Sequence, residues 1–533
     1  MVRGIRNLRT VMAAVALALA TACGGDGSSA GGGTIVVGMR SDFGGFNPIT
    51  SDALYSMELM NYALFTPLVQ YDENLHVQPW LAESWQEEGD TAVVFSLRRD
   101  VTWHDGQRVT AEDVKFTFDR AKLPESASLV GSAFLANVES ATVVDSFTIR
   151  FDYTRPHAQA LEDFWWAPAP KHLLEGVAPA DMRNAPYNRA PVGSGPYRLT
   201  SWEANRQLVI EPYENYPESL GGPPAARRIV FRIIPEASTL LTELMTGGVH
   251  VDIPVMPDQV NQIQSGSGTN LLSFPGRTVY FIGWNNERAP FNDARVRRAL
   301  ALAIDRQEII EALLYGQGQI ATSTVPPWHP LYPPDVEPLA HDPAAAAALL
   351  EQAGWTDTNG DGIREKDGQP LAFELLVSDD ALRRAVAEVV QAQLRLAGAQ
   401  ANIRVTEFQT MLAAHRGRDF DAVFTNWVLD NFQVASAPNA LLHSSQAAVA
   451  SSANRSSVRI PALDALMERA AGTSDENAAR QAWGEFTRIV QQEQPMTFMF
   501  WLNELAGVRD EVSGVEMDPR GEMQTIRDWT LGR

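Results

Sequence analysis

His104 and Asp105 are adjacent residues whose types could perform acid–base chemistry, and a glycine follows them. A histidine next to a carboxylate can serve as an acid–base pair, but an Asp-Gly dipeptide is also common in turns. Thr110 and Asp113 have the spacing of a capping box at the start of the helix that should follow. We therefore interpret His104 and Asp105 as part of a turn and not as a reaction centre.

A second polar residue, Asp430, comes three positions after Trp427, at the end of a buried strand expected over residues 420–427. In α/β lobes, ligands bind outside the ends of such strands. A carboxylate in this place can pair with a cationic group of a ligand. Alternatively, Asp430 is a capping or loop residue without a functional role. The residues alone leave both interpretations open.

Residues 357–362, DTNGDG, match the opening of a calcium-binding loop. The twelfth position of such a loop requires a bidentate glutamate, and here it is Gly368. We interpret the segment as a β-turn before a strand, and we expect no metal or other cofactor. The sequence also contains no hydrolase, nucleotide-binding or zinc motif, which predicts a protein without enzyme activity.

Cys23 is the only cysteine and follows a typical export signal. Arg3, Arg6 and Arg9 precede an apolar run at residues 11–20, which is shorter than the roughly 20 residues that span a bilayer. We expect residues 1–22 to be a cleaved signal peptide, Cys23 to carry a lipid, and residues 23–33, rich in glycine, to form a flexible linker. The mature protein is then expected in the periplasm or on the outer face of the cell membrane.

Composition excludes other classes. With 533 residues and 45% hydrophobic content, the chain is long enough for two or three domains with large cores. The net charge is −22, and there is no run of basic residues, so a phosphate backbone would be repelled. Nucleic acid is not expected as a partner.

The elements that position these residues are organised around residues 279–313. Residues 279–284 alternate like a buried strand, and residues 296–304 repeat apolar side chains at helical spacing. Three basic residues of this segment are predicted to point away from the apolar stripe: Arg295, Arg297 and Arg298. A strand, a helix and a strand expected at residues 373–377, 381–396 and 403–406 indicate an α/β fold.

This segment also carries a family resemblance. Together with residues 103–114 and 192–199, it resembles solute-binding protein family 5, the extracytoplasmic peptide- and nickel-binding components of ABC importers. The positions that carry the resemblance are Asn285, Pro290, Phe291, Asp293, Val296, Arg297, Ala299, Leu300, Ala303, Ile304, Asp305 and Arg306.

The resemblance implies an α/β fold of class II-like architecture, a two-lobe periplasmic-binding-protein clamshell with an extra inserted domain. A discontinuous domain I is expected to combine residues 34–78, 192–285 and 495–533. Domain II is expected at residues 79–191 and domain III at residues 286–494.

The resemblance further implies a monomeric receptor that captures a small solute, foremost an oligopeptide, between closing lobes. It would deliver this solute to an ABC permease with its ATPase subunits. By resemblance, Asp430 would contact the α-ammonium of a peptide whose backbone pairs with the strand near Trp427. The other expected ligand-binding residues are Asn426, Val428, Asp42, Phe43, Asn47, Gly193 and Ser194.

Two departures from the family pattern narrow this expectation. Peptide binders commonly continue into an acidic-Pro pair, whereas Asn431, Phe432 and Gln433 follow here. Dipeptide binders carry an arginine just before the helix expected at residue 381, and here only Arg383 and Arg384 lie nearby. A strict dipeptide binder is therefore not expected. The alternatives are a receptor for a nickel chelate or an oligosaccharide, or a secreted hydrolase.

Overall fold

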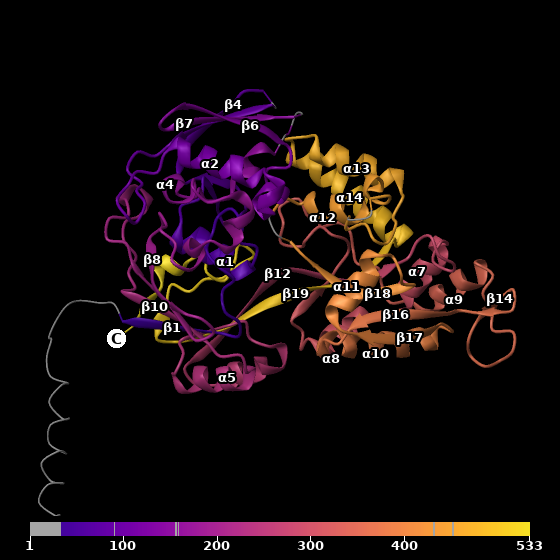
Figure 1. The fold of residues 1–533 in the computed structure, drawn as a ribbon. Coiled ribbons are helices and arrows are strands. Elements are labelled where there is room, and N and C mark those ends of the chain that lie inside the picture. The colour runs from indigo at the N-terminus through magenta and orange to yellow at the C-terminus, as the bar shows by residue number, and fades with distance from the viewer. Residues whose placement is uncertain are drawn as a thin grey trace, which may run out of the picture.

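The computed structural model describes residues 33–89, 91–154, 157, 159–429, 432–449 and 452–532. The expected signal peptide, Cys23 and Asp430 lie outside these residues. The described chain forms the expected two-lobe α/β architecture (Figure 1). We call residues 33–275 and 503–532 the first lobe and residues 278–502 the second lobe. No helix in the described ranges has both the length and the apolar content to cross a membrane.

Within the described residues, one mixed sheet of eleven strands runs through both lobes. Its order starts in the second lobe and ends in the first, with β13 (Gly318–Ile320) joining at the side of β19. The strands are β17 (Gln400–Thr406), β16 (Ala372–Ser378), β18 (Ala422–Val428), β12 (Thr269–Trp284), β19 (Met496–Arg509), β11 (Val251–Ile253), β1 (Thr34–Met39), β10 (Arg228–Ile233), β9 (Gln207–Pro212) and β8 (Tyr197–Glu203).

Two long strands, β12 and β19, cross from one lobe to the other (Figure 1). Their pairing shifts register between Pro275 and Thr278, which leaves Gly276 and Arg277 in a bulge at the crossing. A Cβ atom on Gly276 would lie 2.5 Å from the carbonyl oxygen of Leu502. The bulge therefore requires glycine, and it turns the Arg277 side chain out of the regular ladder.

A separate four-stranded antiparallel sheet lies within residues 79–191, the region expected to form domain II. Its order is β4 (Ala82–Glu87), β5 (Ala92–Leu97), β7 (Thr148–Tyr153) and β6 (Val138–Asp145), and α2 (Ala111–Ala121) packs beside it. The predicted capping box of α2 is confirmed, because the Thr110 amide donates to the Asp113 carboxylate at 2.9 Å. The proposed boundaries of the three domains stay a prediction.

The second lobe combines a parallel strand–helix–strand unit with helices on both sides. The predicted unit is confirmed as β16, α10 (Ala381–Leu396) and β17. Around it lie α7 (Ala294–Ala303), α8 (Arg306–Leu313), α9 (Pro343–Gln352), α11 (Phe408–Arg416), α12 (Ser436–Leu442), α13 (Pro461–Ala471) and α14 (Glu476–Glu493).

The predicted outward direction of Arg297 is wrong. Its side chain is buried and donates to the carbonyl oxygens of Phe291, Glu493 and Gln494. The carbonyls of Glu493 and Gln494 lie where α14 ends and the chain turns into β19. Arg297 therefore joins α7 to the segment that leads from α14 into β19 and back to the first lobe.

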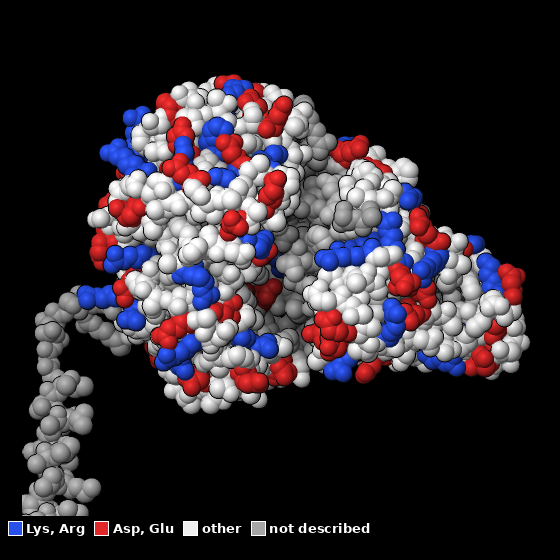
Figure 2. Space-filling model, in the orientation of Figure 1, with Lys and Arg blue, Asp and Glu red and all other residues white. Residues whose placement is uncertain are grey.

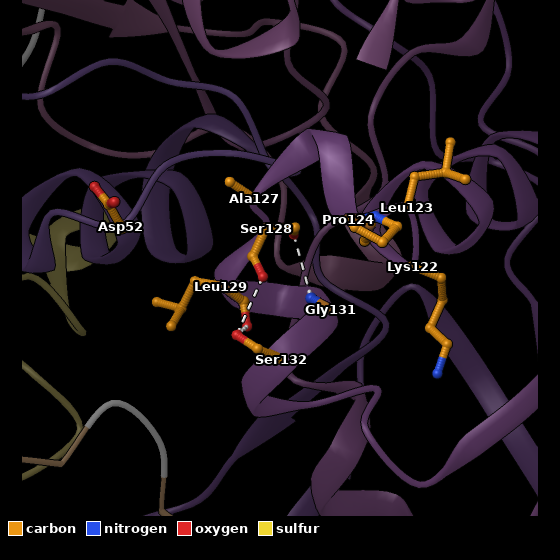
Figure 3. A pocket seen from close by; sticks show the side chains of 10 residues that line it. Asp52, Lys122, Leu123, Pro124, Ala127, Ser128, Leu129, Gly131 and Ser132 are labelled. Carbon is orange, nitrogen blue, oxygen red and sulfur yellow. Dashed lines mark hydrogen bonds between the residues drawn. The ribbon is translucent and has the colours of Figure 1, made fainter. Parts of the chain in front are cut away.

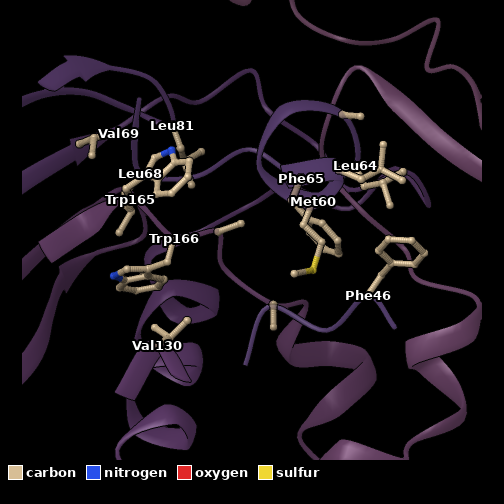
Figure 4. Close-up of a cluster of buried hydrophobic side chains, with 14 of the residues drawn as sticks. Phe46, Met60, Leu64, Phe65, Leu68, Val69, Leu81, Val130, Trp165 and Trp166 are labelled. Carbon is tan, nitrogen blue, oxygen red and sulfur yellow. The ribbon is translucent and has the colours of Figure 1, made fainter. Parts of the chain in front are cut away.

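The first lobe has a core rich in large side chains, part of which is drawn in Figure 4. Met60, Phe65 and Leu68 come from the segment after α1 (Leu54–Leu59), and Trp165 and Trp166 come from a loop about a hundred residues later. Burial of such aromatic side chains contributes about 1.5–3 kcal/mol each. The core thus holds the loop of Trp165 and Trp166 against the segment that follows α1.

Phe432 belongs to the second lobe by sequence but packs into the core of the first lobe. Only 2% of its surface is exposed, and its ring centroid lies 4.9 Å from that of Tyr71 and 5.0 Å from that of Trp165. The next residue, Gln433, donates to Asp163 at 2.6 Å. These contacts join the two lobes, and we infer that they favour a closed arrangement.

We expect Phe432→Ala to shift the protein toward an open state. Burial of a phenylalanine side chain is worth about 1.5–3 kcal/mol, which changes the closed-to-open ratio about ten- to hundredfold. Small-angle X-ray scattering should show a larger radius of gyration for the variant. Leu396→Ala, at a side chain that is 91% exposed, is the control and should scatter like the wild type. An unchanged radius for Phe432→Ala would contradict the assignment of Phe432 to lobe closure.

Candidate ligand-binding cleft

The part of the second lobe best suited to bind an extended ligand is one edge of β18. Its first two residues pair with β16, at Leu375–Ala422 and Leu376–Val423, and β16 then ends at Ser378. Residues 425–428 pair with β12 on the opposite side. In the part of the chain that the structure describes, no strand pairs with their other edge. Backbone donors and acceptors there are available to an added strand.

Arg383 lies over this edge from the first turn of α10. It donates to Asn426 at 2.6 Å and to Ser378 at 2.8 Å, and its guanidinium lies 5.4 Å from the ring centre of Phe408. Its Nε atom is buried and makes no hydrogen bond to the described residues. The structure therefore brings Asn426, one of the predicted site residues, next to a cation that the family pattern did not assign.

The junction of the lobes forms the floor of the cleft and contains buried charges. Arg277, in the bulge of β12, forms an ion pair with Glu58 of α1 at 2.7 Å, and both side chains are almost completely buried. Glu504 and Glu522 line a small cavity beside Arg277. Figure 2 shows the groove between the lobes, with acidic side chains visible deep inside it.

Glu58 and Glu504 have raised pKa values at this junction, and the charge of Arg277 opposes the shift in both. Burial, followed by the charge of Glu522, raises the pKa of Glu58 well above its usual range. The same two causes raise the pKa of Glu504 to about 7. The Oε1 atom of Glu522 is buried and has no hydrogen-bond partner among the described residues. The junction is therefore sensitive to protonation near neutral pH.

Sequence reasoning missed these junction residues although two signals were present. Glu58 is the one charged residue in an otherwise apolar or uncharged stretch at residues 54–64. Arg277 follows Pro-Gly inside a strand pattern, which is typical of a bulge. Neither signal identifies a partner, because Glu58 and Arg277 are 219 residues apart.

Of the residues predicted around Trp427, the structure brings together Asn426, Trp427 and Val428 on the β18 edge. Asp430 lies outside the described residues. The residue just before it, Leu429, donates its amide to the carbonyl oxygen of Arg277 at 3.0 Å. The chain therefore reaches the junction of the lobes immediately before Asp430.

The residues predicted from the first lobe serve its own structure. The Asp42 carboxylate accepts from Trp202 and from the Asn205 amide, at 2.9 and 2.8 Å. Phe43 packs against neighbouring aromatic rings, and Asn47 is fully buried and bonded to Asn188. We therefore leave Asp42, Phe43 and Asn47 out of the proposed site.

Gly193 and Ser194 are likewise buried against the main chain of the first lobe. A Cβ atom on Gly193 would lie 1.8 Å from the carbonyl oxygen of Leu64, which requires glycine there. Ser194 Oγ accepts from the Thr66 amide at 3.0 Å. These contacts explain the two residues by close packing, and we leave them out of the proposed site as well.

The side chains of His104 and Asp105 have different hydrogen-bond partners. The His104 ring bonds to the amide of Gly193 and the carbonyl of Gly195, and burial lowers its pKa to about 4. Asp105 bonds instead to His172 at 2.7 Å. This geometry agrees with the interpretation of the segment as a turn.

The acidic loop at residues 357–362 lies at the outer end of the second lobe, beside β14 (Glu365–Lys366), far from the groove (Figure 1). Asp357, Asp361 and Glu365 place one carboxylate oxygen each within 4.8 Å of one another. Asp357 already accepts from the amides of Gly360 and Gly362, as in a tight turn. The predicted β-turn accounts for these contacts.

A wide recess of about 460 Å³ lies on the first lobe, beside the helical turn that contains Ser128 (Figure 3). Its polar groups are used by the fold: Lys122 donates to the carbonyls of Leu135 and Val138, and Ser128 donates to Ile49. The recess also lacks a contribution from the second lobe. It therefore does not fit a site that closes around a ligand.

Two lobes joined by a pair of crossing strands, with a free strand edge and buried charges at the junction, define a clamshell solute-binding protein. The chain belongs to the bacterial extracellular solute-binding proteins, family 5, whose model, described as "family 5 Middle", matches residues 76–448. This finding confirms the resemblance found in the sequence.

The chain is 29% identical to the oligopeptide-binding protein AppA of Bacillus subtilis (strain 168) over 516 residues, covering 94% of this chain and 92% of AppA. It is 31% identical to the nickel-binding periplasmic protein of Escherichia coli (strain K12) over 376 residues, covering 68% and 69%. The structure of B. subtilis AppA in complex with a nonapeptide superimposes with a TM-score of 0.77 at 27% identity, covering 94% of this chain and 99% of that one.

We expect the junction to make stability depend on pH. An ordinary glutamate has a pKa near 4.5, so between about pH 4.5 and 7 the folded protein retains a proton on Glu504 that the unfolded chain releases. Stability from this group is therefore lost as pH rises through that window. Glu504→Gln imitates the protonated form, and its melting temperature should exceed that of the wild type by more at pH 8 than at pH 5.

Glu485→Gln is the control for this experiment, since the Glu485 side chain is 53% exposed. Its melting temperature should differ from that of the wild type by the same small amount at both pH values. An equal difference at both values for Glu504→Gln would show that Glu504 does not titrate near 7.

Proposed function

We propose that this protein is an extracytoplasmic receptor that closes around an oligopeptide and delivers it to an ABC permease. The observation that carries the proposal is the free edge of β18 at residues 425–428, beside the junction of the lobes. Main-chain pairing with such an edge is independent of the ligand's side chains, so it suits peptides of varied sequence. A similarity to AppA, whose structure contains a nonapeptide, supports the same ligand class.

In this proposal Asn426, Trp427 and Val428 bind the peptide backbone, and the Asp430 carboxylate pairs with its α-ammonium group. An ion pair at one end fixes the register of a backbone that would otherwise slide along the strand. The lobes then close by packing Phe432 against Tyr71, which excludes water from the cleft. The protein performs no reaction on the solute and acts as a monomer.

A second candidate is a receptor for a nickel chelate. The observation that favours it is the 31% identity to the nickel-binding periplasmic protein of E. coli. A chelate would use the charges around the cleft and leave the β18 edge unpaired. The other expected non-peptide solute, an oligosaccharide, has no comparable observation in its support.

We also propose that Cys23 carries a lipid after removal of residues 1–22 and that residues 23–33 tether the lobes to a membrane. The support is the sequence pattern, a basic segment and a short apolar run that end at a lone cysteine. A glycine- and serine-rich tether of this length has a reach of roughly 15–20 Å. That distance leaves the cleft free to face a permease in the same membrane.

Mass spectrometry of the solute released from freshly purified protein tests the ligand class. We expect a mixture of short peptides, because a closed receptor retains its ligand during purification. Nickel with a small chelator, and no peptide, would favour the second candidate. Release of a single cleaved product on incubation with added peptides would contradict a receptor without enzyme activity.

We expect Asp430→Ala to weaken the binding of a peptide with a free N-terminus by at least about tenfold, or 1.4 kcal/mol, since a charge-assisted contact is lost. Isothermal titration calorimetry with free and N-acetylated versions of one peptide provides the measurement. Asp419→Ala, at an 81% exposed side chain of the same lobe, should bind both like the wild type. Equal affinity of the wild type for the two peptides would refute the role of Asp430.

A further inference from the structure

A recess of about 310 Å³ opens beside the free edge of β18, between α11 and α12. Phe408 and Leu412 of α11 and Leu441 of α12 form apolar walls, and Trp427 contributes from the strand. His415 and Arg455 also line it. The recess shares residues 425–428 with the edge that we propose to bind a peptide, so it lies within reach of that peptide's side chains.

Arg455 has an unusual environment for a partly buried arginine. Its Nη1 atom approaches the His415 ring at 3.4 Å, and its Nε atom is buried without a hydrogen-bond partner. No carboxylate of the described residues lies within ion-pair distance of it. By contrast, Arg277 has Glu58 as its counter-ion, and Arg297 is surrounded by carbonyl oxygens. An arginine that lacks both is expensive to bury.

The unpaired atoms around Arg455 are hydrogen-bond donors. His415 is 4% exposed, and its Nδ1 atom faces Arg455, so the proton of the neutral ring is on Nε2, which has no partner. Burial and the charge of Arg455 lower the pKa of His415 to about 3, which keeps the ring neutral. Burial and the charge of nearby Arg416 lower the pKa of Arg455 itself. The missing component of this cluster is an acceptor with negative charge.

The alternation of side chains between the two faces of the sheet indicates which part of a bound peptide can reach the recess. Val279, Phe281 and Trp427 share one face of the sheet, whereas Tyr280 and Phe424 pack on the other. A peptide added to the free edge would direct alternate side chains to these two faces. Every second side chain would therefore point toward the recess.

We infer that this recess is a specificity subsite for a carboxylate of the bound peptide, with Arg455 as its counter-ion and the apolar walls around its stem. This inference rests on the proposed peptide-binding function. A carboxylate accepts hydrogen bonds without donating, which matches the excess of donors, and guanidinium–carboxylate pairs are strong and directional. Two parts of a peptide offer this chemistry, an acidic side chain and the C-terminal carboxylate.

Calorimetry with a set of alanine tetrapeptides tests the inference. Each carries glutamate or glutamine at one position in turn, with a free or an amidated C-terminus. For the wild type, we expect replacement of one carboxylate by its amide to weaken binding at least about tenfold, or 1.4 kcal/mol. A glutamate-to-glutamine effect at one position assigns the recess to an acidic side chain, and an amidation effect assigns it to the chain end.

Arg455→Met should abolish this preference and bind the amide-containing peptides within about threefold of the wild-type affinity, since only the charge-specific contact is lost. Arg455→Lys keeps the charge and should retain part of the preference, which guards against a folding defect in the first variant. Arg395→Gln, which removes one charge at the far end of α10, is the control and should retain the full preference.

Two results would overturn the subsite: no preference for a carboxylate at any position or at the chain end, and a preference that survives Arg455→Met. If none of the peptides binds the wild type, the proposed peptide function fails, and the subsite fails with it. Binding of the peptides without a preference removes the subsite alone and leaves the proposed function intact.

Discussion

The ion pair between Arg277 and Glu58 is the interaction on which the two-lobe arrangement depends. It connects the bulge of β12, at the crossing between lobes, with α1 of the first lobe. The other Glu58 oxygen accepts from the Glu522 amide at 3.0 Å, which adds the C-terminal segment to the same point. Removal of one partner from a buried pair costs about 3–5 kcal/mol, because the remaining charge is left without compensation. The pair therefore anchors the bulge to the first lobe at the point where the chain crosses between the lobes.

The segment that follows β18 connects the Arg277–Glu58 pair to the contact between the lobes. The chain leaves β18 with Leu429 bonded to the Arg277 carbonyl, and Phe432 then inserts beside Trp165 in the first lobe. The guanidinium of Arg277 lies 5.7 Å from the ring centre of Phe432, within range of a cation–π contact. A ligand that contacts this segment when the lobes are closed stabilises the closed state by its differential affinity. The proposed ligand site, the bulge of β12 and the contact of Phe432 with the first lobe are thus linked through Arg277.

The sequence predicted the local elements well and the long-range contacts poorly. The strand–helix–strand unit around α10 and the capping box at Thr110 follow from periodicity and capping chemistry, which act over a few residues. Arg297 shows the limit of that reasoning, because its position outside the apolar stripe of α7 predicted exposure, whereas carbonyls nearly 200 residues away bury it. Charged residues can be placed only when their partners are known.

The same limit applies to the candidate site. Asp430 was singled out because ligands bind at strand ends in α/β lobes, and Trp427 and its neighbours were expected from the family resemblance. In the described residues no strand pairs with the outer edge of residues 425–428. The first-lobe residues were expected from resemblance, and their motif reflects packing, as the approach of Gly193 to the Leu64 carbonyl illustrates. Arg455 carried no motif, and only the structure reveals that no carboxylate of the described residues pairs with it.

A receptor that pairs with a peptide main chain gains affinity without sequence preference, so its selectivity must come from a few charged contacts. The net charge of −22 makes the protein as a whole unfavourable for anionic ligands over long distances. Salt screens that effect beyond about 8–10 Å, whereas a partly buried guanidinium acts at contact distance. A carboxylate that enters the recess would offset part of the cost of burying Arg455, whereas an uncharged group of the same size would not. In the proposed site the strand edge tolerates varied sequences, and the charge-specific contact at Arg455 would therefore select among the peptides that the closed lobes retain.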